Sequence, residues 1–186
     1  RFKNSQNIAE NVSKINIAPF IKDAENWTFF NNNYELSETA IKIYDGYQWA
    51  TLNNKYTNTE LSFRYKQKVQ GDAWAGFYFA QQEVSQYPWA TTGVLLVLSA
   101  NGAELQIRDG ITACTEETGR FITNKDISFE NDRTYDITAG MYDVSSSAVR
   151  IYVIVDGETI FDTTVSSDVL VSKEGYFGAI APGGTE

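Results

Sequence analysis

The 186 residues carry 15 Lys and Arg against 24 Asp and Glu, a formal net charge of −9 that disfavours nucleic acid and anionic membranes as partners. The sequence has no histidine and one cysteine, Cys114, which excludes Ser-His-Asp and Cys-His nucleophile systems, imidazole zinc sites and an internal disulfide. Aromatic residues make up 14% of the chain and prolines number three, a balance that favours aromatic-packed β-sheet over a helical bundle.

The N-terminal segment leaves helix and strand open. Ile8, Val12 and Ile15 recur at helical spacing, but Val12, Ile15 and Ile17 also suit a strand. Trp27 is expected in the core. Two strands are then predicted at 40–44 and 47–53.

Asp45-Gly46, between these two strands, predicts a hairpin turn. Alternating residues of the second strand share one face, which we expect to be core; the alternative is that this face extends an aromatic platform at the surface. Its members are Tyr47, Trp49 and Thr51.

The clearest strand follows at 61–66, where Leu61, Phe63 and Tyr65 alternate with polar residues, as a half-buried antiparallel strand requires. The next run, 73–80, is apolar on both faces. Its alternation separates one set of Ala75, Phe77 and Phe79 from the other set of Trp74, Gly76 and Tyr78.

Further strands are predicted at 92–99 and 104–108 around a type I′ turn at Asn101-Gly102. A second pair at 135–141 and 149–155 is joined by a polar loop, 143–147. The remaining elements are a hairpin turn at Asp156-Gly157 and strands at 159–163 and 175–181.

About a dozen short strands need two stacked sheets or a barrel, because a single open sheet would leave long edges and an unburied face. We expect an all-β antiparallel β-sandwich that forms one domain over residues 1–186. Since the chain starts at Arg1 rather than Met, we expect it to be a piece of a larger multidomain protein. The longest apolar run, 93–98, is too short to cross a bilayer, so no membrane insertion is expected.

The order of these hairpins resembles a known superfamily. The segments AWAGFYFAQQ, GVLLVLSANGAELQIRDG, RTYDITAGMY, AVRIYVIVDGETIFDTT and EGYFGAIA, between Leu61 and Ala181, are similar to the concanavalin A-like lectin/glucanase superfamily, in the branch of laminin-G-like domains and jelly-roll carbohydrate-binding modules. The resemblance implies two curved antiparallel sheets with sugar bound on the concave face or at loops of one edge. Jelly-roll modules of this type often hold a structural calcium ion, so the resemblance also implies a possible structural calcium in this domain.

The superfamily also contains glycoside hydrolases, whose laminarinase-like members carry an E-x-D-x-x-E run on one strand, which places two carboxylates on one face. The nearest match, residues 130–135, lacks the final acid and lies in a polar turn. We therefore expect no catalysis by this domain. No D-x-D-x-D-G loop marks a calcium site, and Asp109-Gly110 and Asp156-Gly157 are better explained as turns.

Sugar recognition needs aromatic faces and a few planar polar groups. Trp74 and Tyr78 share one strand face, and Gln106 and Arg108 share a face of a nearby strand, so the four converge if the strands belong to one sheet. The alternative is that Trp74 and Tyr78 point inward.

A second platform is predicted on the loop 83–90, where Tyr87 and Trp89 bracket a proline; these rings either stay exposed or fold inward as a cap. Cys114 has no neighbouring His or Lys and is expected to be a small buried hydrophobe.

These features predict a non-catalytic carbohydrate-binding module for a neutral polysaccharide or oligosaccharide, extracellular or at the cell surface and attached to a catalytic domain in its parent chain. The alternatives are a laminin-G-like adhesion domain that binds protein and, third, a glycoside hydrolase. Convergent Gln and Arg beside exposed aromatics favour sugar, whereas a large apolar patch without them favours protein.

Overall fold

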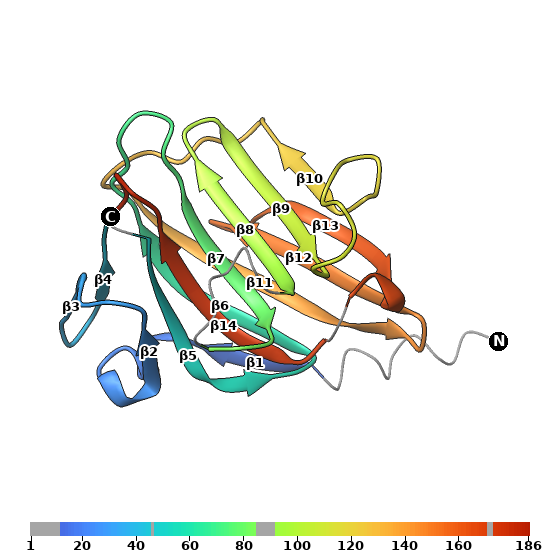
Figure 1. Ribbon diagram of the computed structural model, residues 1–186, viewed down its shortest axis with the longest axis horizontal. Coiled ribbons are helices and arrows are strands. Elements are labelled where there is room, and N and C mark those ends of the chain that lie inside the picture. The colour runs from blue at the N-terminus through green and yellow to red at the C-terminus, as the bar shows by residue number, and fades with distance from the viewer. Residues whose placement is uncertain (1–11, 46, 85–91, 171–172) are drawn as a thin grey trace.

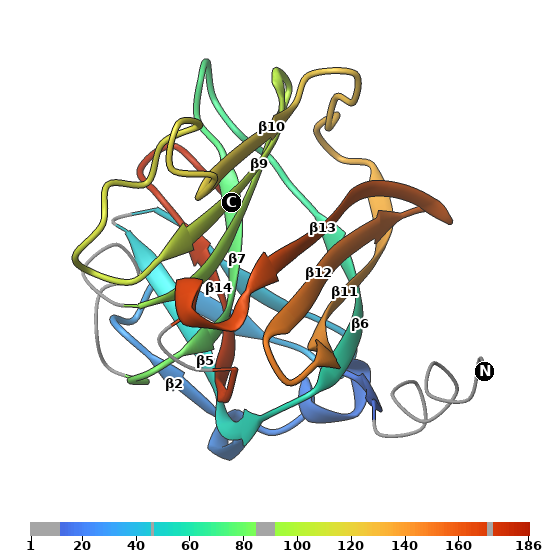
Figure 2. The ribbon, with the colours of Figure 1, turned by 90° about the vertical axis from the view of Figure 1, so that its right-hand side faces the viewer.

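Two large β-sheets stack face to face in the computed structural model (Figures 1 and 2). The structure describes residues 12–45, 47–84, 92–170 and 173–186. Within this part of the chain every large-sheet pairing is antiparallel except one. The predicted all-β antiparallel sandwich is therefore confirmed.

The first sheet has five strands, and its one parallel pair joins its first two members. In spatial order these are β1 (Ser13–Asn16), β6 (Thr59–Lys66), β11 (Thr134–Ser145), β12 (Ala148–Val155) and β13 (Glu158–Ser166). The strand β1 decides the open question at the N-terminus in favour of strand for residues 13–16. Because β11 continues to Ser145, the predicted polar loop at 143–147 is shorter than expected.

The second sheet has seven strands and is antiparallel throughout. In spatial order these are β10 (Phe121–Asn124), β9 (Gly102–Arg108), β8 (Gly93–Ser99), β7 (Ala75–Gln81), β14 (Gly175–Ala181), β5 (Gln48–Tyr56) and β2 (Trp27–Phe29). Strands β7, β8 and β9 lie side by side, so the two strand faces that carry the predicted sugar-contacting residues belong to one sheet.

A small two-stranded sheet lies beside these layers and overturns one prediction. Its members are β3 (Tyr34–Leu36) and β4 (Ile41–Ile43). Since β4 pairs with β3 while β5 pairs with β14 and β2, the hairpin predicted across Asp45-Gly46 is wrong. Asp45 (φ 41°) and Tyr47 (φ 60°) both adopt left-handed backbone.

Helical structure in the described residues is limited to three short 3-10 segments, and none is long enough to span a bilayer. They are η2 (Ala18–Phe20), η3 (Ala24–Asn26) and η4 (Ser167–Val169). The first two precede β2 and help to place Trp27, whose indole Nε1 donates a 2.8 Å hydrogen bond to the carbonyl of Phe20. Trp27 lies in the core, as predicted.

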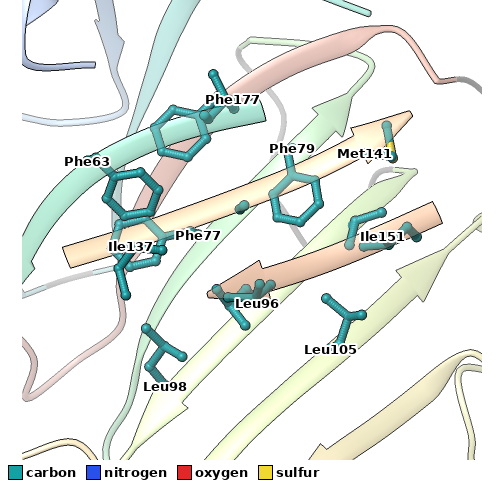
Figure 3. Close-up of a cluster of buried hydrophobic side chains, with 14 of the residues drawn as sticks. Phe63, Phe77, Phe79, Leu96, Leu98, Leu105, Ile137, Met141, Ile151 and Phe177 are labelled. Atoms are coloured by element: carbon teal, nitrogen blue, oxygen red, sulfur yellow. The ribbon is translucent and has the colours of Figure 1, made fainter. Parts of the chain in front are cut away.

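The main core fills the space between the two large sheets (Figure 3). Phe63 from β6 contacts Phe77 from β7 and Phe177 from β14, with ring centroids 4.6 and 5.2 Å apart. Phe79 belongs to the same cluster. The inward face of β7 is therefore the Ala75, Phe77 and Phe79 set, and Tyr78 points away from the core.

The other two predicted hairpin turns, at Asn101-Gly102 and Asp156-Gly157, differ in backbone geometry. Asp156 (φ 51°) and Gly157 (φ 85°) both have positive φ, as a type I′ turn requires. At Asn101-Gly102 only Gly102 has positive φ, at 127°, so the hairpin is confirmed but the type I′ assignment is wrong. Gly102 is needed for close approach, since a Cβ there would lie 2.4 Å from the carbonyl oxygen of Asn124.

Candidate functional site

The outer face of the seven-stranded sheet carries a second apolar cluster that is separate from the main core. An antiparallel sheet with one face on the core normally presents polar side chains on the other. Here the outward residues are buried against one another and against Trp74: Trp49, Tyr78, Leu95, Val97 and Ile180. This departure from the usual pattern, together with the partly exposed ring of Trp74, makes the face a candidate site. We call it the outer apolar face.

The strand register aligns these side chains in rows across the sheet. Trp49 on β5 lies opposite Ile180 on β14, which lies opposite Gly76 on β7. Gly76 lies opposite Val97 on β8, which lies opposite Glu104 on β9. Neighbouring strands are about 4.8 Å apart, so this row covers roughly 19 Å.

A second row runs beside the first and explains how Tyr78 is held. Tyr78 lies opposite Gly178 on one side and Leu95 on the other. Its ring lies across Gly178, where a Cβ would come within 2.3 Å of the phenol oxygen. The hydroxyl reaches Thr51 on the next strand through a 2.5 Å hydrogen bond. Burial raises the pKa of Tyr78, while the hydrogen bond with Thr51 lowers it in part.

The indole of Trp74 lies over another glycine of this face. A Cβ at Gly76 would meet both the Trp74 ring and Ile180 at 2.8 Å, so the indole is seated on the bare backbone of β7. The hydroxyl of Thr185 donates a 3.0 Å hydrogen bond to the carbonyl of Trp74. Trp74 is partly exposed, in contrast to the buried residues around it. It therefore offers aromatic surface near the middle of the sheet.

A polar row on β9 borders the apolar residues. The guanidinium of Arg108 donates two hydrogen bonds, of 3.1 and 2.8 Å, to the amide oxygen of Gln106. The amide nitrogen of Gln106 donates one of 3.1 Å to the carboxylate of Glu104. These bonds fix three planar groups in line. Arg108 and Gln106 each have further N–H donors, and the carboxylate of Glu104 has further acceptor positions. Together these groups can bind hydroxyl groups, which both donate and accept hydrogen bonds.

The loop after β9 is fixed by an ion pair next to Arg108. Asp109 accepts hydrogen bonds from the backbone N–H groups of Ile111 and Thr112 and from the Thr112 hydroxyl, and it pairs with Arg120 at 3.1 Å. These bonds, with the charge of Arg120, lower the pKa of Asp109 to about 2. Cys114 is half-buried rather than buried, and its pKa is raised mainly by desolvation.

Four of the six predicted site residues lie on this one face. Trp74 and Tyr78 come from the β7 region, and Gln106 and Arg108 from β9. Tyr78 is only 2% exposed, so it supports the face from beneath and presents no ring surface to a ligand in this conformation. Tyr87 and Trp89 lie outside the described residues, and the loop platform stays a prediction.

The face also contains residues that the sequence interpretation misplaced or omitted. Trp49 is buried as predicted, but on the outer face rather than in the core between the sheets, because β5 directs Ala50 and Leu52 inward. Tyr47, predicted with it as core, is 49% exposed.

Phe30 and Glu104 were not proposed as site residues. Phe30 is 55% exposed and stacks on Trp49 with ring centroids 3.8 Å apart. Glu104 lies two residues before Gln106 on β9, on the same strand face, and it extends the polar row of Gln106 and Arg108. The same period-two alternation that grouped Gln106 with Arg108 predicts Glu104 as well.

The carboxylates of the described residues do not fit a calcium site. Nowhere in this part of the chain do three Cys, Asp or Glu side chains cluster in a way that suits a metal ion. In the two Asp-Gly turns, Asp109 is engaged by its own loop and Arg120, and Asp156 by the backbone N–H of Asp136 and the guanidinium of Arg133. Both turns are thus explained without an ion.

Comparisons with known proteins bear on the fold. The sequence matches no protein-family model and none of the curated proteins. Among solved structures, a mutant of the Emp46p carbohydrate recognition domain aligns with a TM-score of 0.64 at 11% identity, over 86% of this chain and 82% of that one. Carbohydrate-binding module CBM66 from Bacillus subtilis aligns with a TM-score of 0.58 at 14% identity, over 86% and 89%. A candidate glycosyl hydrolase from Parabacteroides distasonis gives 0.55 at 14% identity, over 88% and 85%.

These likenesses establish the concanavalin A-like jelly-roll fold that the hairpin order predicted. Lectin domains, a carbohydrate-binding module and a hydrolase candidate share it, so the fold alone leaves the activity open. The Emp46p domain occurs in potassium-bound and metal-free forms, which shows that the fold can accept a metal ion in that protein.

Proposed function

We propose that the outer apolar face binds a neutral glycan and that the domain is itself non-catalytic. The observation that carries the proposal is the partly exposed indole of Trp74, seated over Gly76 two strands, or ~10 Å, from the polar row of β9. An indole stacks on the C–H face of one sugar ring, and Glu104, Gln106 and Arg108 then meet hydroxyl groups elsewhere on the glycan.

The distribution of carboxylates supports binding without hydrolysis. A glycosidase flanks the scissile bond with two carboxyl groups. Glu104 is the only Asp or Glu in the seven strands of the sheet. Of residues 130–135, the nearest match to the hydrolase signature, 130–133 form a loop before β11 and 134–135 begin that strand. We expect no release of reducing sugar from any glycan that the domain binds.

The wider setting of the domain is part of the same proposal. Several of the similar structures are carbohydrate-recognition or carbohydrate-binding domains, which supports a carbohydrate ligand here. By analogy we propose an extracellular or cell-surface location and a parent chain that also carries a polysaccharide-degrading domain. A structural calcium ion is not part of the proposal, because the carboxylates of the two Asp-Gly turns, Asp109 and Asp156, are engaged by protein groups.

The decisive experiment measures glycan affinity and thermal stability for single variants. A glycan array first selects a ligand, for which we expect micromolar to millimolar affinity. Trp74→Ala should then weaken binding by at least ~1–2 kcal/mol at a temperature where the variant is fully folded, since a stacked ring loses its contact with the sugar. Tyr142→Ala is the matched control, a partly exposed ring on the outer face of the other sheet.

The outcomes separate the alternatives. If Trp74→Ala binds normally and Trp89→Ala does not, the edge loop is the site instead of the sheet face. If both variants fold and bind normally, the residue assignment is wrong. Affinity that collapses between low and moderate salt contradicts a neutral ligand, because charge would then hold the partner. Turnover abolished by Glu104→Gln would contradict the non-catalytic assignment.

A further inference from the structure

A second aromatic ring, Phe30, stands at the end of the row that runs from Trp49 to Glu104. Strand β2 pairs with β5, and the residue after it, Phe30, donates its backbone N–H to the carbonyl of Trp49 at 3.1 Å. Trp27 and Phe29 pack toward the main core, so the alternation of the chain directs Phe30 to the outer face. The row therefore begins at the edge strand and crosses the whole sheet to β9.

The ring of Phe30 is the aromatic surface that a ligand can touch at this end of the row. Trp49 is only 3% exposed, whereas Phe30 is 55% exposed. The two rings lie within 11° of parallel with centroids 3.8 Å apart, so Trp49 covers one face of the Phe30 ring and supports it. The rest of the Phe30 ring stays accessible.

The backbone that carries Phe30 is held by a buried polar side chain, Gln48. The amide oxygen of Gln48 accepts hydrogen bonds from the backbone N–H groups of Phe30 and Asn31, each 3.1 Å long. Its amide nitrogen donates one of 2.7 Å to the carbonyl of Asn31. Gln48 is fully buried, so these bonds are shielded from water. A ring held in place this way loses little freedom when a ligand stacks on it.

The length and polarity of the row define the ligand. Three strand spacings, or about 14 Å, separate Phe30 from Gly76 under the Trp74 ring, and two more, about 10 Å, separate Gly76 from Glu104. Figure 1 shows these strands in order from β2 to β9. A disaccharide stacked on Trp74 reaches one end of the row at most. The positions between the ends carry no charge: Trp49, Ile180, Gly76 and Val97.

We propose that the outer apolar face binds an extended, linear, neutral oligosaccharide longer than a disaccharide, whose chain crosses the strands from Phe30 over Trp74 to Glu104. Phe30 forms a second stacking subsite, which only the longer ligand reaches. The inference rests on the proposed glycan binding and adds the length of the ligand and its direction on the sheet. Equatorially linked chains such as cello-oligosaccharides have the extended shape that this row accepts.

NMR titrations with cellobiose, cellotetraose and cellohexaose test the proposal. Affinity should rise by at least about fivefold from cellobiose to cellohexaose, because the longer chain adds the contact with Phe30. Phe30→Ala should remove most of this gain and leave cellobiose affinity unchanged, whereas Trp74→Ala should weaken binding at every length. Leu36→Ala is the matched control, an exposed apolar side chain on β3, outside the row.

A second variant separates stacking from support of the fold. Phe30→Leu keeps an apolar side chain over Trp49 but removes the aromatic face, so it should lose the same length-dependent gain with a smaller fall in melting temperature than Phe30→Ala. If Phe30→Leu keeps the gain, or if Phe30→Ala lowers only the melting temperature, the ring merely covers Trp49 and the proposal is wrong.

The length series also distinguishes this inference from the proposed function. If Trp74→Ala weakens binding but wild-type protein binds cellobiose and cellohexaose equally, the glycan site stands and the extended ligand is overturned. If none of the cello-oligosaccharides binds, the extended ligand is again overturned, while the glycan array still decides whether the face binds another sugar. Loss of affinity in Leu36→Ala would contradict the path along the row.

Discussion

The outer faces of the two large sheets share one structural arrangement. On each, a tyrosine ring lies flat across a glycine of the neighbouring strand, Tyr78 over Gly178 and Tyr152 over Gly140. A Cβ would come within 2.3 Å of the first ring and 2.2 Å of the second. The glycines are therefore required by the rings that cover them, and the rings replace the side chains that the glycines lack.

The surroundings of the two rings differ. The hydroxyl of Tyr78 pairs with the neutral Thr51 among apolar neighbours. The hydroxyl of Tyr152 donates to the carboxylate of Glu60, and the guanidinium of Arg150 lies 4.8 Å from its ring centroid.

The two large sheets also differ in the number of charged side chains on their strands. Arg150 also pairs with Asp162 at 2.7 Å on the five-stranded sheet, whose strands hold five carboxylates: Glu60, Asp136, Asp143, Glu158 and Asp162. The strands of the seven-stranded sheet hold one, Glu104. One outer face is thus occupied by its own ion pairs, and the other carries an apolar cluster bordered by a polar row.

The largest expected effect comes from filling the glycine positions. Gly178→Ala should reduce the free energy of unfolding by about 3 kcal/mol, because Tyr78 is enclosed and cannot move away from the new methyl group. Gly140→Ala should cost only about 1–2 kcal/mol, because the flexible Glu60 and Arg150 side chains can move with Tyr152. Urea denaturation measures both, and equal costs would contradict the proposed difference between the faces.

Removal of the two tyrosine hydroxyl groups should again destabilise the seven-stranded sheet more than the five-stranded sheet, but with a smaller difference in the free energy of unfolding. Tyr78→Phe leaves the buried Thr51 hydroxyl without its partner, at a cost of about 1–2 kcal/mol. Tyr152→Phe should cost less than about 1 kcal/mol, since Glu60 keeps water contact and lies 4.0 Å from Lys14. Paired thermal and chemical denaturation checks this order, and a reversed order would show that the Glu60 contact is the stronger one.

The smallest expected effect concerns two aspartates whose pKa values are lowered for different reasons. Hydrogen bonds from its own loop lower the pKa of Asp109 to about 2, whereas the hydrogen bonds of its ion pair with Arg150, followed by the charge of Arg150, lower the pKa of Asp162. Salt at about 0.5 M screens exposed ion pairs, so it should raise the pKa of Asp162 and leave that of Asp109 near its low value.

Carboxyl NMR titrations at two salt concentrations measure these shifts. Because both pKa values are lowered in the folded state, each group stabilises the protein above its ordinary pKa of 3.8 and loses that contribution as the pH falls below it. Asp162→Asn and Arg150→Met should each make the free energy of unfolding depend less on pH below 3.8. An equal response of both aspartates to salt would show that the ion pair is not the main cause for Asp162.

Local sequence signals predicted many of the elements and failed at specific places. Alternation placed β6 correctly because one of its faces is polar and the other apolar. The Asp45 turn failed because its partner strand was chosen by adjacency in sequence, whereas β4 pairs with β3. Phe30 was overlooked as an exposed ring because its stacking on Trp49 joins segments that the chain places 19 residues apart.

The sequence by itself determined which side chains of β7 share a face, since successive residues of a strand point to opposite sides. It grouped Phe77 with Phe79, and Trp74 with Tyr78. Both groups are apolar, so only the tertiary structure decided which one is the core: Phe63 of β6 packs against Phe77 and directs that face inward. The physical reason is that burial between two sheets depends on a partner surface from a distant segment, which period-two alternation within one strand does not specify.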